Sequence, residues 1–161
     1  MIEPPTSNQD LSTTSTRGAL ATLRIIWAAL LVGELVFLGV IFFLLRGANP
    51  PAPGPADVTR MLFFASIVFL AGGVVVGFVL RSRLYNPRQA DGSVAPGKYV
   101  TGNIIFLALC EGPAFFGLVV CMLSGHFLPA VAVPAVAMAI QLLNFPTGAP
   151  LEPTGIPQRP R

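Results

Sequence analysis

An apolar run at residues 25–45, broken only by Glu34, is the feature that most constrains how this chain can fold. An α-helix rises about 1.5 Å per residue, so roughly 20 such residues cross the hydrocarbon core of a bilayer. Further apolar segments follow, and only 11% of all residues are charged, against about 25% in typical soluble domains. The sequence therefore predicts an all-α integral membrane protein.

Four apolar segments, separated by polar or Pro-rich connectors, predict four transmembrane helices. The fourth segment is the shortest, and Pro134 lies near its middle, where a proline usually kinks a helix. If this segment were re-entrant instead of spanning, the side on which the C-terminus lies would have to be reassigned. The expected helices cover about residues 23–45, 60–80, 101–124 and 127–145, within a transmembrane domain of residues 21–146.

The two ends of the chain differ in composition from the apolar segments. Residues 1–20 are polar and rich in Ser, Thr and Pro, and residues 147–161 are rich in Pro. The first stretch has too few apolar side chains to order itself, and proline at the density of the second prevents a helix, so both are expected to be disordered. The start of the chain lacks basic residues, and the first apolar run begins too late and is too long for a signal peptide.

Lys and Arg are distributed unequally between the two sides that this topology creates. Two lie at the N-terminal end, four in the loop between the second and third segments, and two in the C-terminal tail. The opposite side has only Arg46 and Arg60. Because loops rich in Lys and Arg stay in the cytoplasm, both termini and the middle loop are expected there.

Glu34 and Glu111 are the only acidic residues within the apolar segments. Each lies roughly ten residues beyond the cytoplasmic start of its helix, so both are expected near the bilayer midplane. A carboxylate there costs about 2.5–3.5 kcal/mol on insertion scales, so a protonated or proton-sharing acid with a hydrogen-bond partner is expected. The candidate partners are Asn103, Gln141, Asn144 and the backbone carbonyls freed by Pro113 or Pro134.

Two interpretations of these acids are open. In the first, a neutral carboxylic acid forms a hydrogen bond between helices and fixes their packing. In the second, Glu111, together with Glu34, carries protons or cations across the membrane. The surroundings of Glu111 are compatible with both, because Gly112, Pro113 and Gly117 make the third helix locally deformable and allow close packing.

Small residues also predict where helices approach each other closely. Gly73 and Gly77 in the second segment form a GxxxG pattern, which lets two helix backbones come together. Gly33 and Gly39, near Glu34 in the first segment, are further candidates for such packing.

The first and third segments align with each other. Residues 33–45 match residues 111–123, with apolar residues following in both. This match predicts two helical hairpins in the same orientation, a parallel repeat. The aligned pairs are Phe37 with Phe115, Gly39 with Gly117, Gly33 with Glu111, and Glu34 with Gly112.

Three motifs stand out along the chain: GELVF at 33–37, GKYVTGNII at 97–105 and ALCEGPAFFG at 108–117. They resemble an uncharacterised family of small four-helix bacterial membrane proteins. That family has a GxxxF-type first helix and an ALxEGxAxFG third helix, preceded by a basic loop with Lys-Tyr. The resemblance covers most of residues 20–145. It implies a multi-pass protein of the bacterial cytoplasmic membrane and brings no established activity.

The sequence around Glu111 also resembles, more distantly, the proteolipid (c) subunits of rotary ATPases. In those subunits an acid in a helix with small residues carries a proton or sodium ion past a stator, which implies Glu111 as the carrier carboxylate. The chain departs from that pattern because its acid lies in the third helix instead of the fourth, and its tails and middle loop are long for a tightly packed ring. The glycine-rich helix of the proteolipids is reduced to Gly72, Gly73 and Gly77.

No pattern predicts an enzyme, a cofactor or a metal site. The chain has one histidine and no CxxC, Walker or dinucleotide-binding motif. Its basic residues are scattered at segment ends instead of forming a stripe with aromatic residues, which argues against nucleic acid as a partner. The expected partners are the lipid bilayer and either a second copy or other membrane proteins. The expected function is a structural or accessory membrane component, with a proton or cation translocator as the alternative.

Overall fold

Three long helices and a short fourth one form the described part of the chain, residues 7–47 and 52–153 of a computed structural model, with side chains described from residue 16 on. A single 3₁₀ turn, η1, follows the fourth helix. The elements are α1 (Ser7–Arg46), α2 (Ala56–Tyr85), α3 (Pro96–Ser124), α4 (Ala132–Leu143) and η1 (Ala149–Leu151).

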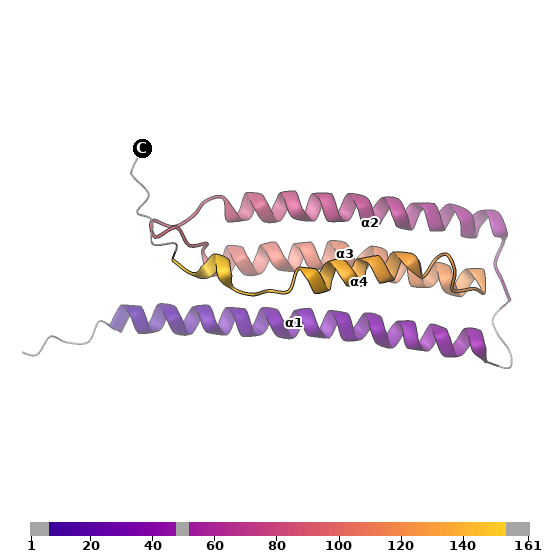
Figure 1. The fold of residues 1–161 in the computed structure, drawn as a ribbon, viewed down its shortest axis with the longest axis horizontal. Helices are drawn as coiled ribbons and strands as arrows, with labels where there is room; N and C mark the ends of the chain where they lie inside the picture. Colours follow the sequence, from indigo (N-terminus) through magenta and orange to yellow (C-terminus); the bar gives the residue numbers. More distant parts are fainter. Residues whose placement is uncertain (1–6, 48–51, 154–161) are drawn as a thin grey trace, which may run out of the picture.

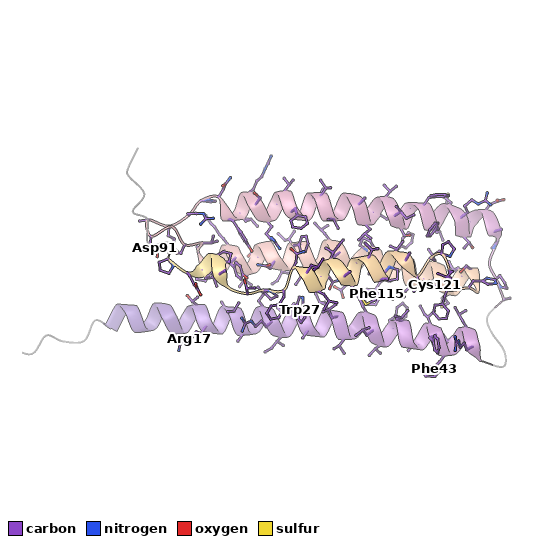
Figure 2. The ribbon with its side chains drawn as sticks, in the orientation of Figure 1. Arg17, Trp27, Phe43, Asp91, Phe115 and Cys121 are labelled. Atoms are coloured by element: carbon purple, nitrogen blue, oxygen red, sulfur yellow. The ribbon has the colours of Figure 1, made fainter. Side chains whose placement is uncertain are left out.

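The three long helices are long and apolar enough to cross a membrane, which confirms three of the predicted spans. Windows of 18 residues in α1, α2 and α3 reach mean hydropathies of 2.6, 2.5 and 2.2. Large apolar side chains cover their outer faces, such as Phe43, which is 75% exposed and points away from the other helices (Figure 2). Exposing such a surface to water is unfavourable by about 25 cal/mol per Å², whereas lipid tails accept it. The protein is a membrane protein.

The central helix of the bundle is α3, which lies between α1 and α2 (Figure 1). It packs against α1, α2 and α4, while α1 and α2 are consecutive in the chain but are not packed against each other. The predicted hairpin of α1 packed against α2 is therefore wrong. The reason is that α3 buries half of its apolar window, against 17% for α1 and for α2. Its small residues let neighbouring helices approach it, so α1 and α2 both pack on α3.

The fourth helix is shorter than predicted. Its 12 residues rise about 18 Å, against a hydrocarbon core of about 30 Å. Pro134 lies in its first turn and not at its middle, so the missing N–H has no intrahelical partner to lose and no kink results. The predicted helix at 127–145 is thus corrected to Ala132–Leu143, and four spanning helices are not observed.

After α4 the chain returns to the end of the bundle at which α3 begins (Figure 1). There the Val94 N–H, just before α3, donates to the Pro150 carbonyl at 2.8 Å. Of the two tails predicted from the sequence, residues 7–20 belong to α1 and residues 147–153 include η1; the remaining tail residues lie outside the described ranges. Leu20 of α1 packs against Gly148, which has a φ of 88°. Few residues other than glycine adopt this backbone conformation.

Candidate functional site

Glu34 lies in the core, where α1 meets α4. Its side chain and that of Gln141 are both 0% exposed. Gln141 donates a hydrogen bond from Nε2 to Glu34 Oε1 at 2.6 Å. Of the partners that the sequence allowed for this acid, the structure selects Gln141.

The remaining side-chain oxygens of this pair complement each other chemically. Glu34 Oε2 and Gln141 Oε1 are both buried and have no hydrogen-bond partner among the residues that the structure describes. With an ionised Glu34, both oxygens would be acceptors without a donor, a costly arrangement in the core. A neutral carboxylic acid has one donor and one acceptor, which match the C=O and N–H of a primary amide. Protonation of Glu34 would therefore satisfy both oxygens at once.

Two more side chains of α1 bind the end of α4 and the segment after it. Trp27 donates from Nε1 to the Gln141 carbonyl at 3.0 Å, and Arg24 donates from Nε to the Pro146 carbonyl at 3.2 Å. Trp27 lies where α1 faces the rest of the bundle (Figure 2). Sequence reasoning missed both residues in this role. Their spacing was the available signal, because residues 24, 27 and 34 share one face of a helix.

Glu111 is half-buried on α3, and its carboxyl has no hydrogen-bond or ion-pair partner among the described side chains. It lies near Glu34, the other acid within the apolar helices. The rings of Phe37 and Phe115 are 5.4 Å apart, so α1 and α3 are in contact just beyond these acids. The two acids are therefore neighbours, but only Glu34 belongs to the hydrogen-bonded pair.

The predicted GxxxG pair lies where α2 meets α3. A Cβ atom on Gly73 would lie 2.5 Å from the Leu109 carbonyl oxygen, and one on Gly77 would lie 2.9 Å from Phe106 Cδ2. Such separations are shorter than van der Waals contact, so a larger residue would require the backbone of α3 to shift at Gly73 and the Phe106 ring to shift at Gly77. These two glycines allow α2 to pack closely on α3.

The other glycines that were predicted to pack fall into two groups. A Cβ on Gly117 would lie 2.9 Å from Pro134 Cδ, so this glycine allows α4 to approach α3. Pro113, inside α3, is buried on the same helix. At the remaining three positions a Cβ would meet no atom within 4 Å in the described part of the chain, so close packing there stays a prediction: Gly33, Gly39 and Gly112.

Asn103, predicted as a possible partner of the acids, instead forms hydrogen bonds near the end where α3 begins. It donates from Nδ2 to the Tyr85 hydroxyl at 2.5 Å and to the Tyr99 carbonyl at 2.8 Å. The Tyr85 and Tyr99 rings stack with centroids 5.6 Å apart. The Tyr99 hydroxyl in turn accepts a hydrogen bond from the Gly148 N–H at 3.1 Å. Asn103 thus connects α2 and α3, and the tyrosines extend the contact to the C-terminal segment.

Asn144, the other predicted amide partner, pairs with a charged residue. Its Oδ1 accepts a hydrogen bond from Arg81 Nη1 at 3.2 Å, and its Nδ2 donates to the Ile140 carbonyl at 2.8 Å. It therefore joins the end of α4 to the end of α2 and makes no contact with either acid.

No protein-family model, curated protein or solved structure matches the chain. The assignment of a function therefore rests on the geometry of these residues, and the two resemblances remain predictions.

The chemistry available at the site is hydrogen bonding between neutral groups. Among the side chains of residues 16–47 and 52–153, no three His, Cys, Asp or Glu come together as metal ligands. Cys110 and Cys121 are both buried free thiols. The arrangement of Glu34 and Gln141 can join helices, and a proton could be held there between an acid and an amide.

Proposed function

We propose that this protein is a structural or accessory component of a membrane. The observation that carries the proposal is the fully buried pair of Glu34 and Gln141, joined by a 2.6 Å hydrogen bond between α1 and α4. A neutral acid opposite an amide uses both of its hydrogen-bonding groups on that one partner. Such an acid holds two helices together, and both of its oxygens are then occupied by Gln141.

The membrane placement that we propose is the bacterial cytoplasmic membrane with both termini in the cytoplasm. Residues before α3 and after α4 lie at one end of the bundle, because Val94 and Pro150 are hydrogen-bonded there. Arg24 reaches the Pro146 carbonyl near the same end, and Arg81 reaches Asn144. Since Lys and Arg gather on the cytoplasmic side of membrane proteins, this end is the cytoplasmic one.

The alternative function is a proton or cation translocator, and one observation favours it. Glu111 is half-buried, its carboxyl has no partner among the described side chains, and Glu34 is its electrostatic neighbour. An unpaired acid within a transmembrane helix is by default a candidate ion carrier. A measurement of proton flux across a reconstituted membrane distinguishes the translocator from the structural component.

We expect liposomes that contain the wild-type protein to show no proton flux above that of protein-free vesicles. The same result is expected for Glu111→Gln, because glutamine keeps the size and the hydrogen-bonding capacity of a neutral acid. A pH-sensitive dye inside the vesicles, with a potassium diffusion potential as driving force, reports the flux. Glu152→Gln, which removes an exposed acid outside the helices, is the matched control. Wild-type flux that Glu111→Gln abolishes, with the fold retained, would establish the translocator.

A second measurement tests whether Glu34 is neutral. The infrared difference spectrum between wild type and Glu34→Gln, recorded at neutral pH, is expected to contain the carbonyl stretch of a protonated carboxylic acid. The physical reason is that only the acid form supplies the donor that Gln141 Oε1 lacks. The difference spectrum of Glu152→Gln should lack this band. A carboxylate band in its place for Glu34 would contradict the proposed pair.

A further inference from the structure

Arg81 lies in the last turns of α2, and the partners described for its guanidinium are neutral. Its guanidinium donates to Asn144 Oδ1 at 3.2 Å and lies 5.2 and 5.0 Å from the ring centroids of Phe78 and Phe106. No Asp or Glu among the described residues forms an ion pair with it. The side chain is only half-buried. An unneutralised guanidinium beside an open surface is available to an anion.

An apolar groove lies between α2 and α4, on the part of α2 that precedes Arg81. Its volume is about 490 Å³, and every side chain that lines it is apolar. The groove continues along the helices over several turns, a shape that fits a hydrocarbon chain lying parallel to them. The lining residues include Ile67, Leu70 and Val74 of α2 and Val133, Val136 and Ile140 of α4.

The spacing along both helices places the polar pair at the end of this groove. Arg81 follows Val74 by seven residues on α2, and Asn144 follows Ile140 by four residues at the end of α4. Residues at these spacings share one helix face. The hydrogen bond between Arg81 and Asn144 therefore joins α2 to the end of α4 beyond the last groove residues, at the end that we assign to the cytoplasm.

A second, polar cavity lies beside Arg81. Its volume is about 290 Å³, and it is lined by Phe78, Arg81, Ser82, Tyr85, Asn86 and Arg88. The lining contains two guanidinium groups, two hydroxyls and an amide, but no carboxylate. Arg88 is held in place by a hydrogen bond from Nη1 to the Gly92 carbonyl at 3.0 Å. Guanidinium and hydroxyl donors are the groups that bind phosphate oxygens in proteins.

Asp91, the acidic residue in the loop between α2 and α3, is hydrogen-bonded to Ser93 in the same loop. Asp91 accepts hydrogen bonds from the Ser93 hydroxyl at 2.7 Å and from the Ser93 N–H at 2.9 Å. These bonds favour the charged form and lower the pKa of Asp91. The carboxylate is thus held by the loop's own residues and does not line the polar cavity.

We propose that this site binds an anionic phospholipid, with the headgroup phosphate at Arg81 and Arg88 and one acyl chain in the groove between α2 and α4. A free phosphate ion would use only the polar cavity, whereas a phospholipid uses the groove as well. Anionic lipids are concentrated in the cytoplasmic leaflet, on the side to which we assign these arginines. The proposal depends on the membrane location and not on whether Glu34 or Glu111 moves protons.

The test measures retained phosphatidylglycerol by native mass spectrometry after purification from vesicles of phosphatidylcholine and phosphatidylglycerol. Arg81→Gln is expected to lower the retained amount by about fivefold, the effect of one basic residue on binding to an anionic lipid surface. The matched control is Arg60→Gln, which removes the same charge from an exposed position at the opposite end of α2 and should change nothing. Equal retention by Arg81→Gln and Arg60→Gln would overturn the proposal.

A second variant tests the groove and leaves Arg81 in place. Val136, which is 50% exposed in the groove, becomes bulkier in Val136→Trp. This variant should lose phosphatidylglycerol while its affinity for inorganic phosphate, measured by calorimetry, stays at the wild-type value. Full lipid retention by Val136→Trp would overturn the lipid assignment even if Arg81→Gln fails to fold. Displacement of the lipid by millimolar inorganic phosphate would also overturn it, because the site would then recognise the free ion.

Discussion

Gly73→Ala is expected to destabilise the protein by about 1–3 kcal/mol, the range for overpacking a close contact. The added Cβ would lie 2.5 Å from the backbone oxygen of Leu109. A carbonyl oxygen in the middle of α3 cannot rotate away as a side chain could, so α2 and α3 must separate. Because α1 and α4 also pack against α3, a shift of α3 away from α2 weakens their packing as well. Unfolding in mixed detergent micelles, followed by circular dichroism, measures the change.

The control for this experiment is the neighbouring glycine of the same helix. A Cβ on Gly72 meets no atom within 4 Å. Gly72→Ala should therefore leave stability unchanged or raise it by about 0.5–1 kcal/mol, because alanine loses less backbone entropy than glycine in a helix. The two substitutions are chemically identical and one residue apart, so opposite signs isolate the helix contact. Equal effects would mean that α2 and α3 are not packed as observed.

Gln141→Leu is expected to lower the free energy of unfolding by about 1–3 kcal/mol, the cost of leaving a buried polar group without a partner. The substitution leaves Glu34 enclosed between helices with no hydrogen-bond donor or acceptor among the described side chains. The double variant Glu34→Leu with Gln141→Leu should regain most of this loss, because neither polar group then stays buried alone. Thermal unfolding in detergent gives both values and hence the coupling energy.

Glu34→Gln provides the sharper control for the same pair. Two primary amides can also form a pair of hydrogen bonds, so this variant should remain close to the wild type in stability. If Glu34→Gln is as unstable as Gln141→Leu, an amide cannot replace the carboxyl of Glu34, and the proposed pairing of a neutral acid with an amide fails. This outcome would direct attention back to proton movement through Glu34 and Glu111.

Much of the candidate site was open to sequence reasoning, but the pairing of its residues was not. Glu34 and Glu111 were recognisable because an acid in an apolar run is rare, and Gln141 was one of three amide side chains that could reach one of them. The choice of Gln141 depends on the rotation of α4 about its own axis. That rotation also decides that Asn144 meets Arg81.

The sequence by itself determined the three long helices. The length and apolarity of a segment are local properties, and they decide whether a helix can cross the hydrocarbon core of a bilayer. It also indicated the contact through Gly73 and Gly77, since a GxxxG pattern places two small residues on one helix face. Only the tertiary structure decided that α3 is the central helix and that α4 is short. These features depend on which faces of separate helices meet, and side chains far apart in the chain determine that choice.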